Sequence, residues 1–196
     1  MSGSAALIRN TRCPSGGSPT IATDDAPYPD FALRVPTMED APAYCAFLAD
    51  REVSIWLEDR CQVPVPLSGV QAYFAEGGFA RWAIECQGEF VGLAGLEHHD
   101  PARGTAGVFI VIGARRLWGR GLGAAVLCEI VGRGFKDLGL RKINSDILEP
   151  NIASLKIHEK AGFVKEGRLR QDAWRAGRWV DRILLSILAE EDEEPA

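Results

Sequence analysis

The sequence lacks a long apolar run. None of its hydrophobic stretches approaches the roughly 20 consecutive apolar residues that a transmembrane helix needs. The opening segment, MSGSAALIRNTRCPSGGSPT, also lacks the apolar core of a secretory signal. We therefore expect a cytoplasmic protein that has no membrane partner.

An excess of positive charge and a cluster of metal ligands are missing as well. The chain has 22 Lys and Arg residues against 27 Asp and Glu residues, and this formal net charge of −5 argues against a general nucleic-acid binder. The five cysteines and three histidines form no C-x-x-C pair and no mixed Cys/His cluster. The sequence therefore indicates neither a nucleic-acid partner nor a metal site.

The length and composition fit one globular domain. A chain of 196 residues is long enough to bury a substantial core. Ser, Gly, Thr and Pro are frequent near the N-terminus, so we expect residues 1–30 to form a flexible segment. The single predicted domain spans residues 31–190, and residues 191–196 form a short acidic tail.

Hydrophobic periodicity predicts a chain of the mixed α/β (α+β) class. The segments typical of strands are 31–35, 81–87, 88–99, 105–113, 140–148, 163–174 and 178–188. The segments with helical spacing are 37–50, 64–78, 119–138 and a stretch that begins after Asn151. Residues 51–57 extend the first of these helices or follow it. Tight turns are predicted at Gln87–Gly88–Glu89 and around Ala176–Gly177.

The segment RRLWGRGLGAA, residues 115–125, places glycines at every second position: Gly119, Gly121 and Gly123. It lies between an apolar strand and the longest predicted helix. A helix N-terminus presents unpaired N–H groups and a partial positive charge, so it binds phosphate readily. Glycines would let such a ligand touch the backbone, and Arg120 would add a cation. The alternative is that the glycines only allow a strand and a helix to pack closely.

Two common phosphate-binding patterns do not fit this segment. The Walker pattern requires a Lys, and the segment contains none. The dinucleotide pattern G-x-G-x-x-G/A is formally met by Gly119, Gly121 and Ala124, but ARRLW separates it from the strand and too little chain follows it.

A second polar pattern occurs in DILEPNIASLKIHEKAGF, residues 146–163. On a helix that starts after Asn151, the side chains of Asn151, Ser154 and His158 lie on one face. Asn151 alone would be interpreted as a helix cap, and His158 alone as an ordinary surface or core histidine. Beside a phosphate loop, the three residues together indicate the wall of a site.

Together the two segments resemble the GCN5-related N-acetyltransferase (GNAT) family, in the branch with the ribosomal-protein N-terminal and the amino-sugar and small-amine acetyltransferases. GVFIVIGARRLWGRGLGAAVL resembles its acetyl-CoA motif, and EPNIASLKIHEKAGFVKEGRLR resembles its N-x-x-S-x-x-x-Y-x-K-x-G-F segment. The resemblance covers residues 31–188. It implies a mixed central sheet of six to seven strands with a splayed strand pair that holds acetyl-CoA. It also implies direct transfer of the acetyl group to a primary amine, by a monomer or a homodimer.

The resemblance assigns cofactor contacts to particular residues. Trp118 takes the place of the motif's first Gln or Arg when Gly121 and Gly123 are its glycines; a second frame uses Arg116, Gly119 and Gly121. The backbone over residues 119–124 would hold the pyrophosphate, and the strand ending at Ile112 would pair with the pantetheine arm. The residues expected to contact acetyl-CoA are Ile110, Val111, Ile112, Trp118, Gly119, Arg120, Gly121, Leu122, Gly123, Ala124, Asn151 and Ser154.

Catalytic roles follow from the same resemblance. His158 stands where the family usually has the Tyr that protonates the departing CoA thiolate, a role that imidazole can fill. Asp146 stands where some members carry a Glu base, although it could instead be a strand-end carboxylate paired with an Arg. Apart from the resemblance, GLEHHD ends the strand before the cofactor-binding strand and offers three further candidate bases, Glu97, His98 and His99, unless that segment is an exposed turn. The main-chain N–H groups around Val111–Ile112 would stabilise the oxyanion.

The acceptor is left open between a peptide N-terminus, an amino-sugar and another small amine. Trp56, which lies among acidic residues, indicates an acceptor region or a core position, and the basic stretch 165–182 could receive an anionic acceptor. The sequence leaves two other functions open: an acyl-CoA-binding module without catalysis, and a nucleotide-binding oxidoreductase.

Overall fold

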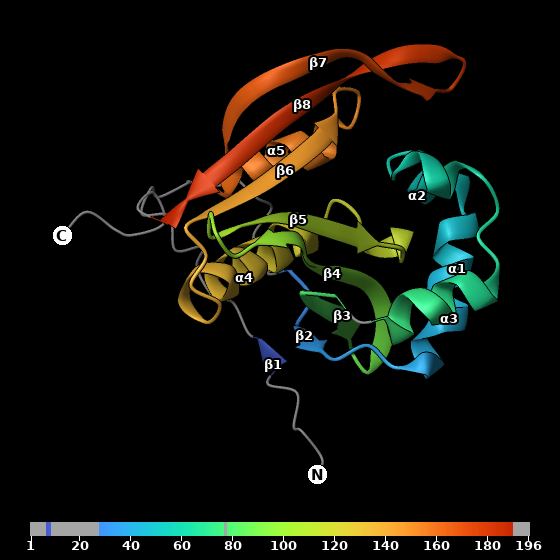
Figure 1. Cartoon of the computed structure of the whole chain (residues 1–196). Helices are drawn as coiled ribbons and strands as arrows, with labels where there is room; N and C mark the ends of the chain where they lie inside the picture. Colours follow the sequence, from blue (N-terminus) through green and yellow to red (C-terminus); the bar gives the residue numbers. More distant parts are fainter. Residues whose placement is uncertain (1–6, 9–27, 77, 190–196) are drawn as a thin grey trace.

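The computed structural model describes residues 7–8, 28–76 and 78–189, and these form one mixed α/β layer structure around a single sheet (Figure 1). The strands are β1 (Leu7–Ile8), β2 (Phe31–Arg34), β3 (Ala80–Cys86), β4 (Glu89–Asp100), β5 (Thr105–Ile112), β6 (Lys142–Leu148), β7 (Val164–Arg175) and β8 (Arg178–Leu188). The helices are α1 (Ala41–Ala49), α2 (Arg51–Ser54), α3 (Leu67–Ala75), α4 (Leu122–Lys136) and α5 (Ile152–Lys160). The expected fold class is confirmed.

The seven predicted strands correspond to β2 to β8, and β1 is an addition. β1 pairs with β2 through Leu7 and Ile8, although the sequence predicts a flexible segment there. The rest of the predicted N-terminal segment up to residue 27, and the acidic tail 191–196, lie outside the described residues.

The sheet opens between β5 and β6. The strand order is β1-β2-β3-β4-β5-β6-β8-β7, and β5–β6 is its parallel pair. That pair covers Thr105–Lys142, Ala106–Ile143 and Gly107–Asn144 only. Beyond it, β5 continues beside β4 to Ile112, while β6 continues beside β8 to Leu148. The predicted splayed strand pair is therefore present, and it leaves a slot between β5 and β6.

Two hairpins form where the sequence predicts tight turns. Gln87 and Gly88 both have positive φ, at 53° and 78°, and so do Ala176 and Gly177, at 49° and 78°. Two-residue hairpin turns favour such dihedrals because their twist matches that of the flanking strands. The second turn makes β7 and β8 a long arm that reaches over toward α2 (Figure 1).

The core has one layer on each face of the sheet. Leu122, Val126 and Ile130 of α4 pack against one face. Tyr44 of α1 and Val70 of α3 pack against the other face. β5 lies between the layers, so its alternate side chains reach both of them.

Several helices are shorter than predicted, and α1 spans only Ala41–Ala49 of the predicted 37–50. Asp50 has extended backbone angles and caps α2 by accepting a hydrogen bond from the N–H of Glu52 at 2.9 Å, so α2 follows α1 as a separate helix. α4 begins at Leu122 and ends at Lys136, whereas the prediction was 119–138. Among the described residues, no helix combines the length and apolar character needed to cross a membrane.

Candidate active site

Positive backbone dihedrals account for two of the three alternating glycines. Gly119 has φ of 73° and Gly121 has φ of 79°, a region that residues with a side chain rarely adopt. Gly121 is the N-cap of α4, so helical dihedrals start only after the loop. A Cβ at Gly119 would meet open space, which means that its conformation and not crowding requires glycine there. The loop therefore exposes backbone at the start of a helix.

Gly123 differs from Gly119 and Gly121. It lies inside α4, where an added Cβ would be 3.4 Å from Ile157 of α5 and 3.5 Å from Ile112 of β5. These are ordinary van der Waals distances, so neither crowding nor backbone conformation requires a glycine at this position.

Trp118 ties the glycine loop to the end of β5. Its indole Nε1–H donates a hydrogen bond of 2.8 Å to the carbonyl oxygen of Ile112. The guanidinium of Arg115 lies 5.8 Å from the centre of the Trp118 ring. The position of the loop is therefore set relative to the strand that lines the slot.

The backbone of β5 presents alternate residues to the slot. The N–H of Gly113 donates to the carbonyl of Val91 at 3.0 Å, so this opposed pair is hydrogen-bonded. In an antiparallel ladder the pattern repeats every second residue, so the amide of Val111 also faces β4. The backbone polar groups of Ile110 and Ile112 point the other way, into the slot. Of the oxyanion donors predicted around Val111–Ile112, the N–H of Ile112 therefore faces the slot, whereas the N–H of Val111 is directed at Leu93.

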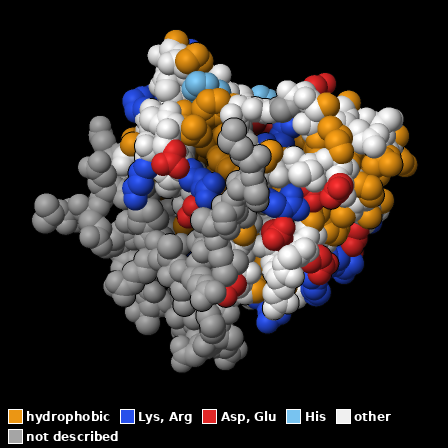
Figure 2. All heavy atoms as spheres, turned by 90° about the horizontal axis from the view of Figure 1, so that it is seen from below, with side chains coloured by type: hydrophobic (Ala, Val, Ile, Leu, Met, Phe, Trp, Pro, Cys, Tyr) orange, Lys and Arg blue, Asp and Glu red, His pale blue; other side chains and the backbone are white. Residues whose placement is uncertain are grey.

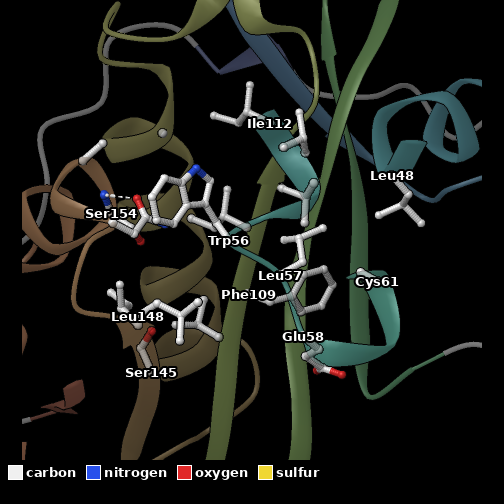
Figure 3. A pocket seen from close by; sticks show the side chains of 18 of the residues that line it. Leu48, Trp56, Leu57, Glu58, Cys61, Phe109, Ile112, Ser145, Leu148 and Ser154 are labelled. Atoms are coloured by element: carbon white, nitrogen blue, oxygen red, sulfur yellow. Dashed lines mark hydrogen bonds between the residues drawn. The ribbon is translucent and has the colours of Figure 1, made fainter. Parts of the chain in front are cut away.

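A cavity of about 960 Å³ joins the glycine loop, the slot and the segment around α2. Most of the residues predicted for the site line it: Glu97, Ile110, Val111, Ile112, Trp118, Gly119, Gly121, Leu122, Gly123, Ala124, Asp146, Asn151, Ser154 and His158. Arg120 is exposed and is absent from this lining. Figure 3 shows the Trp56 indole in the middle of the cavity, between Ser154 on one wall and Ile112 on the other.

His158 is buried and hydrogen-bonded at both ring nitrogens. Nδ1 lies 2.8 Å from the carbonyl oxygen of Ser154, which can only accept, so Nδ1 carries the proton. Nε2 lies 3.0 Å from Oγ of Ser145 and accepts its hydroxyl proton. Burial lowers the pKa of His158 to about 4, so the ring is neutral near pH 7. The expected acid role stays a prediction, in the modified form that His158 acts through Ser145.

Ser145 is a site residue that sequence reasoning missed. It directly follows Asn144, the last β6 residue paired with β5, so it lies where the slot opens. It is buried and lines the cavity. A serine within a strand carries no signal in sequence, and its link to His158 spans 13 residues.

Asn151 and Asp146 both have the structural roles that the sequence offered as alternatives: Asn151 caps a helix, and Asp146 is paired with an arginine. The Asn151 side-chain oxygen accepts from the N–H of Ser154 at 3.2 Å, so Asn151 caps α5 while also lining the cavity. Asp146 forms an ion pair with Arg182, which also bonds Asp172 at 2.5 Å. The carboxylate of Asp146 is thus held by a guanidinium that it shares with Asp172.

Glu97 is the residue of GLEHHD that lines the cavity. The nearest cationic candidate to its carboxylate is His98, at 3.6 Å with 82% of its side chain exposed. His98 adopts a positive φ at a bulge in β4, and His99 stacks on Phe79 with ring centres 3.8 Å apart. His98 therefore stays beside Glu97 while His99 packs on Phe79, and of the three only Glu97 lines the cavity.

The end of the cavity near α2 and α3 is largely apolar and aromatic. Its lining includes Trp56, Leu57, Cys61, Tyr73 and Phe109. Tyr73 stands on the guanidinium of Arg81, 3.7 Å from the ring centre, and burial raises its pKa, so its hydroxyl is neutral. On the face seen in Figure 2, the described residues show acidic, basic and hydrophobic side chains interspersed.

Ion pairs hold several charged residues of the predicted basic stretch. Arg168 pairs with Asp181 and Glu149, and Glu166 pairs with Lys142. Only Arg182 of this stretch lines the cavity, and its charge is already compensated.

A match to a family model identifies the protein family of this chain. Residues 30–164 match the model described as the acetyltransferase (GNAT) domain. The chain is a GNAT acetyltransferase. As a member of this family it uses acetyl-CoA to acetylate an amine, and the non-catalytic and oxidoreductase alternatives are set aside.

Individual relatives agree with this assignment. The chain is 31% identical to the uncharacterized N-acetyltransferase YoaA of Bacillus subtilis, over 80% of this chain and 92% of that protein. It is 28% identical to an L-methionine sulfoximine/L-methionine sulfone acetyltransferase of Pseudomonas paraeruginosa, over 80% and 93%. The spermidine N-acetyltransferase of Vibrio cholerae, solved with CoA and spermine, matches with a TM-score of 0.74 at 22% identity, over 83% and 97%. The last likeness concerns the fold.

Proposed function

We propose that this GNAT enzyme acetylates a small primary amine carried on a compact, largely apolar body, such as an amino acid or an amino-acid analogue. The observation that carries this proposal is the aromatic acceptor end of the cavity around Trp56, Tyr73 and Phe109. Aromatic side chains bury an apolar body well, and a few polar groups then fix its orientation.

The charges at the cavity argue against a polyamine acceptor. Three carboxylates line it: Glu58, Glu97 and Asp146. Glu58 is paired with Arg60 at 2.7 Å and Asp146 with Arg182, so only Glu97 lacks an arginine partner among them. A polyamine carries several cationic amines, whereas this cavity offers one such carboxylate. The sequence relative that acts on methionine derivatives supports the same class.

Acetyl-CoA would lie along the other part of the cavity. Its pyrophosphate would bind the N–H groups over residues 119–124, at the positive end of α4. Its pantetheine arm would pair with the outward backbone groups of Ile110, while the Ile112 carbonyl stays bonded to Trp118. The thioester would then reach Ser145 and Ser154 at the opening of the slot. Arg120, exposed on the same loop, would meet the phosphates from outside the cavity.

The transfer would be direct. Glu97, itself or through one water, takes the proton of the ammonium, and the amine attacks the acetyl carbonyl. The C–N bond forms, the slot-facing N–H of Ile112 binds the oxyanion, and the C–S bond breaks. The second amine proton goes to the CoA thiolate. For that last step the Ser145 hydroxyl would turn from Nε2 of neutral His158 to donate a hydrogen bond to the thiolate. Asp146 is the alternative base.

Holding both substrates in one cavity supplies the main rate gain by proximity. No metal takes part in this scheme. We place the enzyme in the cytoplasm, as a monomer or homodimer without a nucleic-acid or membrane partner.

An acceptor screen tests the proposed class. Thiol release from acetyl-CoA is measured with apolar amino acids and their analogues, polyamines, amino-sugars and peptides with free N-termini, and products are verified by mass spectrometry. We expect turnover with the apolar amino-acid group. A clear preference for polyamines or amino-sugars would overturn the assignment of the acceptor, while leaving the transfer chemistry intact.

A further inference from the structure

Arg175 is a buried cation that neither cosubstrate requires. It lies at the end of β7, beside the turn of the β7–β8 hairpin, and is only 4% exposed. Burying a guanidinium is costly unless its N–H groups find acceptors. The buried guanidinium of Arg175 therefore needs hydrogen-bond acceptors, and two of them lie on a distant part of the chain.

The guanidinium is bonded on every side. Nε donates to the carbonyl of Ile55 at 2.9 Å, and Nη2 donates to the carbonyl of Leu57 at 2.8 Å. Nη1 donates to the carbonyl of Trp174 at 2.8 Å and forms an ion pair with Asp59 at 2.7 Å. Two of these acceptors are 118 and 120 residues away in sequence. The planar fork of arginine suits such divided contacts, and the single ammonium of lysine does not.

These bonds connect the two halves that the slot separates. The hairpin belongs to the β6–β8 side, where Ala173 and Val180 pack on Leu148. Ile55 and Leu57 belong to the α1–α3 side. In Figure 1 the hairpin arm reaches across the open end of the slot to α2. Arg175 therefore joins the two walls at the end opposite the β5–β6 pairing.

The residue between the two bonded carbonyls is Trp56. Its backbone is held on both sides by one guanidinium, and its indole lies in the middle of the cavity (Figure 3). The same segment continues to Glu58 and Cys61, which also line the acceptor end. A change in the position of this backbone would move the acceptor wall, whereas the glycine loop lies on other elements.

We propose that Arg175 is a positioning residue for the amine acceptor. By bonding the carbonyls of Ile55 and Leu57 it fixes Trp56 in the cavity and makes the β7–β8 hairpin part of the acceptor site. The proposal rests on the proposed function, because the acceptor must bind at the Trp56 end. It does not depend on which amine is the acceptor.

Arg175→Gln and Arg175→Lys test this role, with Arg178→Gln as the matched control on the same turn. Arg178 is exposed, so its loss leaves the segment in place. For both Arg175 variants we expect the KM of the amine found in the screen to rise about tenfold or more, since several hydrogen bonds to a charged group are lost. The Kd for CoA, measured by calorimetry, should stay within about twofold because the glycine loop is untouched.

Amide hydrogen exchange provides a readout that needs no acceptor. Exchange over residues 55–62 should become faster in both Arg175 variants and stay unchanged in Arg178→Gln, while exchange in α4 stays unchanged in all three. An inactive wild type with faster exchange in the variants would refute the proposed function and keep the structural role. Unchanged exchange, or an equal loss of affinity for amine and CoA in folded protein, would overturn the positioning role. Should Arg175→Gln fail to fold, Arg175→Lys decides by the same measurements.

Discussion

Oγ of Ser145 lies 3.0 Å from Nε2 of His158, and this contact joins β6 to α5 beneath the slot. The Ser154 carbonyl accepts the proton on Nδ1, so the serine hydroxyl must donate to Nε2. A neutral histidine is therefore part of the fold. Its protonation would reverse this hydrogen bond, so that Nε2–H donates to Oγ, and would place a positive charge in a buried position.

The first prediction concerns His158 and the stability of the protein at acid pH. Burial lowers its folded pKa to about 4 from 6.5, so the unfolded chain binds its proton more readily. The stability due to neutral His158 is complete above about pH 6.5 and is lost as the pH falls toward 4. Between pH 7 and pH 5 the wild type should lose about 2 kcal/mol of unfolding free energy through this group alone.

Urea denaturation at the two pH values measures this loss, with His158→Gln as the comparison. Gln can replace the hydrogen bonds without titrating. The variant should lose about 2 kcal/mol less than the wild type on the same acid shift. Equal losses in both proteins would mean that His158 is not held neutral by burial.

The second prediction concerns Gly121. Gly121→Glu places a carboxylate at the N-cap of α4, where the pyrophosphate is expected, and should abolish CoA binding in calorimetry. Gly139→Glu is the matched control, since Gly139 also has a positive φ, of 64°, and open space around it. Both variants bear similar backbone strain. If both retain CoA affinity, the glycine loop does not hold the cofactor.

The third prediction concerns the bond from Trp118 to Ile112. Trp118→Phe keeps an aromatic ring but removes the N–H that donates at 2.8 Å. Losing one such hydrogen bond should weaken CoA binding by roughly threefold to tenfold, because the loop is then less well placed against β5. Trp179→Phe, at an exposed ring near the hairpin turn, should bind CoA like the wild type. Unchanged CoA affinity in Trp118→Phe would show that the loop does not need this hydrogen bond to hold the cofactor.

The fourth prediction separates the two candidate bases. Glu97→Gln should lower kcat by about 10²-fold or more, with partial recovery at high pH where more free amine exists. Asp146→Asn should have the smaller effect, because Asp146 is already committed to Arg182. pH–rate profiles of both variants measure this. The reverse order of effects would move the base to Asp146.

Much of the fold could be predicted because its signals are local. Alternating apolar residues marked the strands from Phe31 onward, and the turns at Gly88 and Gly177 carried the expected residues. The start of α4 was wrong by three residues, since periodicity does not reveal that Gly121 adopts a positive φ. The two-residue strand β1 is too short to leave a pattern.

The parts of the site that belong to a sequence motif could be predicted. The contacts between residues far apart in sequence could not. The glycine loop and the Asn151–His158 face were found, and both line the cavity. Ser145 was missed because its partner lies on another element, and the contacts of Arg175 with Ile55 and Leu57 span more than a hundred residues. Burial also changed the state expected for His158, and sequence spacing contains no information on burial.

In the proposed mechanism one cavity holds acetyl-CoA and the amine together for direct transfer. Initial rates measured over a matrix of acetyl-CoA and amine concentrations test this mechanism. We expect double-reciprocal lines that intersect, because both substrates must be bound before the acetyl group moves. Parallel lines would show that the acetyl group first passes to the enzyme, and would contradict it.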